Sequence, residues 1–182
     1  MTQILGISGS LRKASYNTSL LCTASGLAPD GISIQIFDLS PTPLYNDDLA
    51  KDNPPPAAID LRKSIKRSGG ILIASPEYNY SFTGVLKNAL DWASTDTLGN
   101  LLTGKPIAIM GASRSVFGTA RGQLHLRQVL IAADAYVVQR PEIYIRRAQT
   151  VIDEHGNLSD DHAREKIQSL LAALIEMIKT TK

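Results

Sequence analysis

The segment GISGSLRKASYNT, residues 6–18, begins within the first apolar run of the chain and leads into a helical pattern. It holds four Ser or Thr hydroxyls, one Asn amide and two cations, and it contains no acidic residue. The start of an α-helix leaves backbone N–H groups unpaired and carries about half a unit of positive charge. A loop of hydroxyls and cations at that position predicts a seat for a phosphate dianion.

Short apolar runs alternate with longer helical patterns along the chain. The apolar runs predict strands over 3–8, 33–39, 70–75, 105–112 and 135–139, and residues 141–145 either extend the fifth strand or pair at an edge. The periodic segments predict helices over 18–27, 57–67, 83–94, 118–133 and 160–179. Five strands that alternate with helices are typical of an α/β fold, a doubly wound parallel sheet covered on both faces.

Two local details complete the predicted organisation. Asn17 is the expected N-cap of the first helix, because an Asn side chain accepts a hydrogen bond from an N–H group of the first turn. Residues 41–56 hold five of the nine prolines and are expected to form a long loop. No linker or internal repeat interrupts the pattern, so residues 1–182 are predicted to form a single domain.

The composition places the chain among globular proteins and argues against several partners. It is 43% hydrophobic with a net charge of +2, and its cations are dispersed, which argues against nucleic acid. No apolar run approaches the roughly 20 residues needed to span a bilayer. The start of the chain lacks the pattern of a secretory signal, so a cytoplasmic protein without membrane insertion is expected. The single cysteine, Cys22, has no partner for an intrachain disulfide and is expected to be buried.

Three polar loops follow the first, third and fourth predicted strands, at residues 8–17, 76–82 and 111–118. In open parallel sheets, ligands bind beyond the carboxyl ends of the strands, where the strand order reverses. The first loop is either a polar helix cap that binds nothing or a phosphate site. Its candidate donors are the hydroxyls of Ser10, Ser15 and Thr18, the N–H groups near Asn17 and the guanidinium of Arg12.

The second polar loop begins with Pro76, which fixes the turn after a rigid apolar strand. Backbone N–H and C=O groups near Glu77 and Asn79 can face the edge of a planar heterocycle while Tyr78 lies alongside. Such a loop suits a flavin ring, whose pyrimidine side alternates donors and acceptors. The alternative is that Tyr78 and Tyr80 pack in the core or at a subunit interface, where aromatic residues are common.

The third polar loop carries Ser113, which is placed to donate a hydrogen bond to the other side of such a ring. Arg114, the next residue, either meets an anionic substrate or is a mobile surface cation. Together the three loops predict one ligand site with a phosphate end and a ring end.

Other signals of nucleotide or metal chemistry fail. No G-x-G-x-x-G follows the first strand, which argues against a dinucleotide bound in Rossmann fashion. Residues 99–105 fit G-x-x-x-x-G-K, but Pro106 replaces the Ser or Thr that would bind Mg²⁺. His125, His155 and His162 are scattered, and no two of them have metal-ligand spacing.

Six motifs occur in one order along nearly the whole chain: GSLRKASYN at 9–17, PEYNYS at 76–81, GVLKNALDW at 84–92, FGTAR at 117–121, HLR at 125–127 and RPE at 140–142. In this order they resemble the NADPH-dependent FMN reductase family. That family includes bacterial quinone and chromate reductases and some azoreductases. The second and third motifs are the most specific part of the resemblance.

The resemblance implies a flavodoxin-like fold with strand order 2-1-3-4-5, non-covalently bound FMN, NADPH or NADH as the electron donor, and homodimers that assemble into homotetramers. The implied phosphate contacts are Ser10, Arg12, Ser15, Tyr16, Asn17 and Thr18. The implied contacts to the flavin ring are Pro76, Glu77, Tyr78 and Asn79, with Ser113 from the later loop. Arg114-Ser115 departs from the small, often Gly-rich residues expected there.

The function that follows is an FMN-dependent NAD(P)H oxidoreductase that works by a ping-pong mechanism. The nicotinamide passes a hydride to the flavin and leaves, and a quinone or similar small acceptor then occupies the same face and takes the electrons. The flavin carries this chemistry, so no catalytic side chain is required. The alternatives are a flavodoxin-type electron carrier without reductase activity of its own and a cofactor-free binding module.

Overall fold

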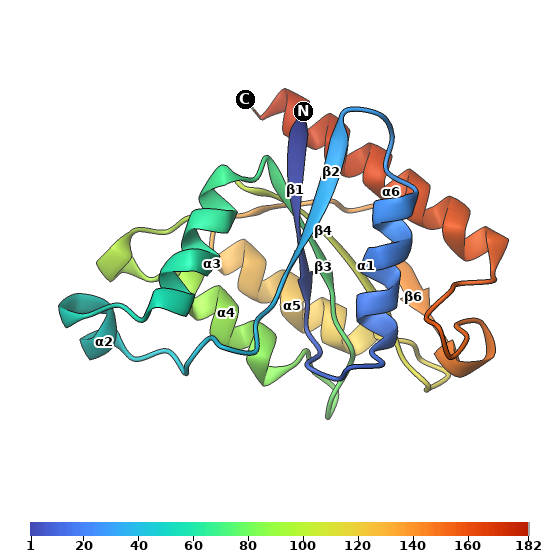
Figure 1. Ribbon diagram of the computed structural model, residues 1–182, viewed down its shortest axis with the longest axis horizontal. Coiled ribbons are helices and arrows are strands. Elements are labelled where there is room, and N and C mark those ends of the chain that lie inside the picture. Colours follow the sequence, from blue (N-terminus) through green and yellow to red (C-terminus); the bar gives the residue numbers. More distant parts are fainter. Residues whose placement is uncertain (182) are drawn as a thin grey trace.

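The computed structural model describes residues 1–181 and has a parallel sheet at its centre (Figure 1). Its strands lie in the order β2-β1-β3-β4-β5, and β6 also pairs with β4. The strands are β1 (Thr2–Ser8), β2 (Ile32–Phe37), β3 (Gly70–Ala74), β4 (Pro106–Ala112), β5 (Tyr136–Val137) and β6 (Ile143–Ile145). The helices are α1 (Tyr16–Gly26), α2 (Asp47–Asp52), α3 (Pro56–Arg67), α4 (Gly84–Ser94), α5 (Ala120–Ala132) and α6 (Asp161–Thr180).

Helices cover both faces of the sheet, as the alternation of strands and helices predicts. Side chains of the three central strands point alternately to the two faces, so Ile71 and Ile73 of β3 join one core cluster and Leu72 and Ala74 join the other. Residues of α3, α4 and α5 complete the first cluster, and residues of α1 and α6 complete the second. Figure 1 shows α1 beside α6 on one side of the sheet.

The predicted strand order 2-1-3-4-5 is confirmed, and it is the flavodoxin-like order. The fifth strand is shorter than predicted, because β5 has only two residues. The segment at 141–145 pairs at the edge, where β6 continues the partnership with β4 beyond β5. Pro141 lies between the two short strands, and a proline has no N–H to donate to a ladder.

Three local predictions are wrong. Ser15, not Asn17, caps α1, because its Oγ accepts the N–H of Thr18 at 3.3 Å. The segment at 41–56 is not all loop, since α2 forms there behind the N-cap Asn46. Cys22 is exposed, because the buried stripe of α1 consists of Asn17, Leu20, Leu21 and Ala24, at helical spacing.

None of the helices within residues 1–181 combines the length and the apolar character that crossing a bilayer demands.

The long segment before α3 is held against the body of the molecule by Trp92. The fully buried indole of this α4 residue donates its Nε1–H to Pro43 O at 2.8 Å. Trp92 is therefore a packing residue, as expected for an aromatic side chain on the inner face of a helix.

Gly111 in β4 is tightly packed against Ser75 and Thr119 near the carboxyl edge of the sheet. A Cβ built there would lie less than 3.0 Å from the backbone oxygen of Ser75 and from Oγ1 of Thr119, closer than real Cβ atoms come. Only glycine fits this position without moving the end of β3 or the start of α5.

Replacing Gly111 with alanine should lower the free energy of unfolding by about 1–3 kcal/mol, because the added methyl group overpacks a rigid backbone contact. Chemical denaturation of the purified protein measures this change. Gly84→Ala is the matched control, because the first position of α4 has open space around it and tolerates a Cβ. Equal stability of the two variants would contradict the packing described here.

Candidate cofactor-binding site

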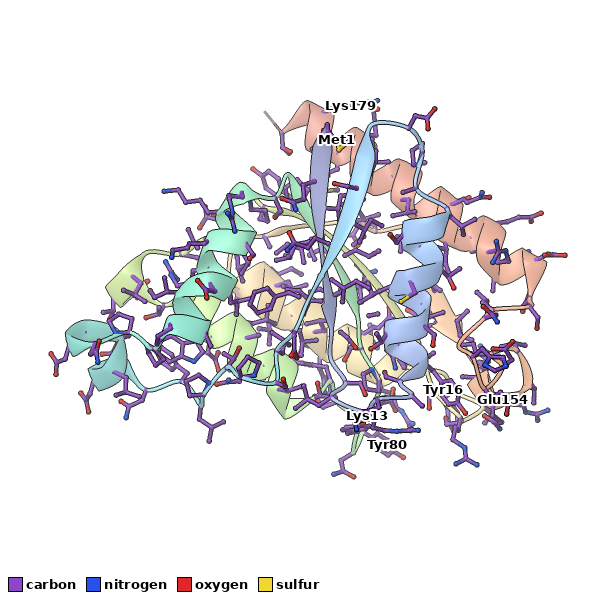
Figure 2. The ribbon with its side chains drawn as sticks, viewed as in Figure 1. Met1, Lys13, Tyr16, Tyr80, Glu154 and Lys179 are labelled. Carbon is purple, nitrogen blue, oxygen red and sulfur yellow. The ribbon has the colours of Figure 1, made fainter. Side chains whose placement is uncertain are left out.

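The three polar loops meet at the carboxyl edge of the sheet, around a cleft of about 190 Å³. Nine of the eleven predicted contact residues line this cleft, and the exceptions are Thr18 and Asn79. Ala112 and Arg114 line it as well. Figure 2 shows Lys13, Tyr16 and Tyr80 together at this end of the molecule, far from Met1 and Lys179 at the other. The sheet therefore brings together segments that are about 35 to 100 residues apart in sequence.

Hydroxyl and N–H groups crowd the start of α1. The Ser8 hydroxyl lies 3.3 Å from the N–H of Ser10, and the Ser10 hydroxyl lies 3.4 Å from the N–H of Arg12. Within residues 1–181 the N–H groups of Tyr16 and Asn17 have no hydrogen-bond acceptor, as is usual in the first turn of a helix. These free donors at the positive end of α1 can bind a phosphate.

The side chain of Asn17 does not face this phosphate seat. Its Nδ2 donates to Ala112 O at 3.0 Å, and its Oδ1 accepts the N–H of Ala112 at 2.9 Å. Both residues are buried, so the amide fastens the start of α1 to the end of β4. If Asn17 contacts a phosphate, it does so through its backbone N–H.

Thr18 and Asn79 do not line the cleft. The hydroxyl of Thr18 lies 2.9 Å from that of Ser8. Asn79 is at the tip of the tight turn after β3, where Tyr78 and Ser81 exchange two backbone hydrogen bonds of 2.8 and 3.0 Å. Asn79 and Tyr80 both have positive φ in this turn. Tyr78 and Tyr80 are 51% and 65% exposed, so neither packs in the core.

The carboxylate of Glu77 is held by α5 rather than by the cleft. Arg121 donates its Nε–H to Oε1 at 2.6 Å, and the N–H of Gly122 donates to Oε2 at 3.0 Å. The Glu77 side chain is only 5% exposed. A contact between Glu77 and a flavin ring would therefore come from its backbone.

Arg121 is a site residue to which the sequence analysis gave no role. Its guanidinium carbon lies 3.8 Å from the ring centroid of Tyr80 and 4.7 Å from that of Phe117. Together with the ion pair to Glu77, these contacts join the turn after β3, the turn before α5 and α5 itself. The only sequence signal is its place in the motif FGTAR, which gives no hint of the partner.

Ser113 is positioned by the segment that follows β6. Its N–H donates to Ile145 O and its carbonyl accepts the N–H of Ala148, both at 3.0 Å. Its Oγ accepts the N–H of Ser115 at 3.1 Å, which leaves the hydroxyl hydrogen free for a ligand. Strand β6 and the residues after it thus hold the third polar loop in place.

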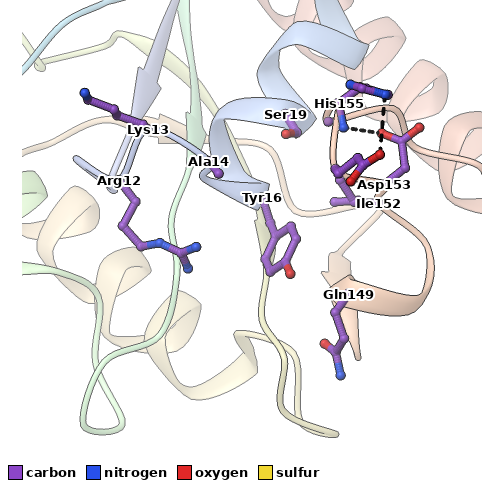
Figure 3. Close-up of a pocket in the computed structure, with 11 residues that line it drawn as sticks. Arg12, Lys13, Ala14, Tyr16, Ser19, Gln149, Ile152, Asp153 and His155 are labelled. Carbon is purple, nitrogen blue, oxygen red and sulfur yellow. Dashed lines mark hydrogen bonds and ion pairs between the residues drawn. The ribbon is translucent and has the colours of Figure 1, made fainter.

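A larger groove of about 620 Å³ lies on the other side of Tyr16 and shares Arg12 and Tyr16 with the cleft. Figure 3 shows Arg12 and Tyr16 on one side of this groove and Asp153 and His155 on the other. Hydrogen bonds from the side chain and the backbone N–H of Asn157 hold the pKa of Asp153 below its usual value. The groove is lined by two carboxylates, Asp153 and Glu154, and by two cations, Arg12 and Lys13. The carboxylates repel a phosphate, whereas the cleft has one carboxylate, Glu77, which is paired with Arg121.

The strand order defines a flavodoxin-like fold, and the cleft lies between the start of α1 and the loops after β3 and β4. The sequence pattern of the NADPH-dependent FMN reductase family matches residues 2–150. The chain therefore belongs to this family.

Named relatives agree with the assignment. The chain is 51% identical to an NAD(P)H-dependent FMN reductase of Pseudomonas aeruginosa, over 94% of this chain and 92% of the relative. It is 36% identical to a quinone reductase of Escherichia coli, over 99% and 97%. Among solved structures it is similar to FerB, a flavoenzyme NAD(P)H:(acceptor) oxidoreductase from Paracoccus denitrificans, with a TM-score of 0.89, 31% identity and coverage of 99% and 98%.

Replacing Asn17 with alanine should lower the free energy of unfolding by about 2–4 kcal/mol, because two buried backbone groups of Ala112 lose their partners. Thermal or chemical denaturation measures the loss. Asn53→Ala is the matched control, since Asn53 is exposed and the structure shows no hydrogen bond from its side chain. A loss no greater than that of the control would show that the Asn17 amide does not tie α1 to β4.

Proposed function

We propose that this chain binds FMN non-covalently in the cleft and catalyses the NAD(P)H-dependent reduction of quinones and similar small acceptors. The observation that carries the proposal is that two loops line one cleft at the end of a flavodoxin-like sheet. The loop after β1 would bind the phosphate, and the backbone of the loop after β3 would form hydrogen bonds with the edge of the flavin ring. The family assignment and the relatives named as FMN and quinone reductases support it.

The donor set of the cleft fits FMN. The Ser10 and Ser15 hydroxyls, the Arg12 guanidinium and the N–H groups of Tyr16 and Asn17 would hold the phosphate. Among residues 1–181, Glu77 is the only acidic residue that lines the cleft, and its charge is paired with Arg121, so a dianion would meet no free carboxylate from this part of the chain. The ring would lie against Pro76, Glu77 and Tyr78 on one side and Ser113 on the other.

Bound FMN supplies the redox chemistry, since it accepts a hydride from a nicotinamide and gives electrons to an acceptor. The protein's part is placement. Tyr78 and Tyr80 are more than half exposed, so the wall beside the ring end of the cleft is open to solvent. Donor and acceptor would use this open side in turn, as in a ping-pong mechanism, and no side chain is needed as a nucleophile or general acid.

The second candidate is a flavodoxin-type electron carrier with the same cofactor but no reductase activity of its own. The names of the relatives do not favour it. The mild positive charge of the chain also counts against an acidic docking face.

The assembly and the compartment are part of the same proposal. Leu124 and Ile131 are 57% and 66% exposed and lie seven residues apart on the outer face of α5, which favours a homodimer formed through that face. Two dimers would then form the tetramer. Cys22 is a free, exposed thiol, which suits a reducing cytoplasm. The described chain would act as one FMN-binding domain.

The purified protein, loaded with FMN, should oxidise NADPH or NADH steadily in the presence of a benzoquinone and without any second protein. Anaerobic stopped-flow spectroscopy measures bleaching of the bound flavin by the nicotinamide, and addition of the quinone measures its reoxidation. Protein that is yellow but is not bleached by either nicotinamide would be a carrier. Protein that takes up no flavin would overturn the proposal as a whole.

Replacing Arg12 with alanine should raise the dissociation constant of FMN by about tenfold or more, because a charged hydrogen bond to the phosphate is lost. Hydride transfer in the loaded fraction should change little, since Arg12 serves the phosphate end. Equilibrium dialysis with FMN measures retention. Lys66→Ala, which removes an exposed cation from α3, is the matched control and should retain FMN like the parent protein.

A further inference from the structure

Cations without acidic partners collect at the carboxyl edge of the sheet. Most other Lys and Arg side chains within residues 1–181 either lie within 4.0 Å of a carboxylate or donate to backbone carbonyls. Five side chains in the loops at the carboxyl edge do neither: Arg12, Lys13, Arg114, Arg146 and Arg147. The charge therefore exceeds what the protein itself neutralises there.

Arg114 has a particular place among these five cations. It lines the cleft, and its neighbours Ser113 and Ser115 are fixed by hydrogen bonds to Ile145, Arg147 and Ala148. Within the described part of the chain, its guanidinium has no hydrogen-bond or ion-pair partner. An exposed guanidinium on a fixed backbone beside a cleft is ready to bind an anion in a forked geometry.

Arg147 is connected to the loop of Arg114 by a backbone hydrogen bond. Its N–H donates to Ser115 O at 3.2 Å, and it has the left-handed conformation, with φ 44°. An arginine in this conformation is uncommon. The segment after β6 runs beside the third polar loop, and it carries an exposed arginine next to the backbone of Ser115, the neighbour of the exposed Arg114 that lines the cleft.

The single phosphate of FMN does not account for this rim. That phosphate is served by the N-terminus of α1, the hydroxyls of Ser10 and Ser15, and Arg12, all from the loop after β1. The other anionic reactant of the proposed function is the nicotinamide donor, which carries a pyrophosphate in NADH and a further ribose phosphate in NADPH. A quinone is neutral and makes no use of a cation at the rim.

We propose that Arg114, supported by Arg147, binds a phosphate group of the nicotinamide dinucleotide and so holds the donor over the cleft. This inference rests on the proposed function and assigns a role to the one cleft residue at which the chain departs from the small residues expected in its family. Arg114 takes part in binding only, because the hydride passes between donor and flavin without it.

The test compares donors that do and do not carry phosphate. FMN-loaded protein is mixed anaerobically with NADPH, NADH or the phosphate-free donor N-benzyl-1,4-dihydronicotinamide, and bleaching of the flavin is followed against donor concentration. Arg114→Ala should raise the concentration of NADPH or NADH that gives half-maximal bleaching rate by about tenfold to a hundredfold, the effect of one charged hydrogen bond. The limiting rate should stay near that of the parent.

The phosphate-free donor should bleach Arg114→Ala and the parent protein alike. Arg114→Lys, which keeps the charge but loses the fork, should fall between them. Arg147→Ala should weaken both dinucleotides, though less than Arg114→Ala. Arg67→Ala is the matched control and should behave like the parent, because Arg67 is an exposed cation without an acidic partner at the end of α3, near the opposite edge of the sheet.

Two results would overturn the inference while leaving the proposed function intact. One is an equal loss with all three donors, which would mean that Arg114 acts on the flavin or its pocket. The other is an unchanged half-maximal concentration for both dinucleotides. If instead none of the three donors bleaches the flavin of the parent protein, the proposed function itself fails.

Discussion

The buried amide of Asn17 bonds to both backbone groups of Ala112 and so ties two walls of the cleft together. Helix α1 and strand β4 are far apart in sequence, and they also pack together in one core cluster. The amide adds a directional contact that fixes the start of α1 against the end of β4. Because both partners are buried, the pair of hydrogen bonds is also costly to break. The rest of the site is built around this tie.

The second constraint is electrostatic: the negative charges near the cleft are engaged elsewhere. Glu77 belongs to the loop that would read the flavin edge, yet its carboxylate is directed to Arg121 and to the first turn of α5. Asp153 and Glu154 lie across the larger groove, on the far side of Tyr16. What remains in the cleft is a set of hydroxyls, free N–H groups and guanidinium groups. That set can donate hydrogen bonds to an anion such as a phosphate.

The same arrangement fits an enzyme in which bound FMN carries the chemistry. Apolar strands β1, β3 and β4 hold the three loops rigidly, because each strand is buried from both faces. The aromatic residues after β3 stay at the surface, held by the left-handed turn and by the stacking of Arg121 on Tyr80. A rigid cleft with one open wall would place a flavin and leave it accessible.

The apolar pattern of the sequence determined the four longer strands and the three loops of the site, because these depend on residues that are local in the chain. The strand order was implied by the resemblance of the six motifs to a known family, not by the pattern itself. The sequence did not determine which residue caps α1, because Ser15 and Asn17 are both residue types that cap helices. Ser15 is the cap in the structure, and the Asn17 amide instead bonds to Ala112, 95 residues away. Nor did it determine where Glu77 points, since its partner Arg121 is 44 residues distant. The exposure of Cys22 followed from the helix register set by packing on α6 and the sheet. Local residue type fixes what a side chain is able to bind, but only the folded chain brings its partner within a hydrogen-bond length.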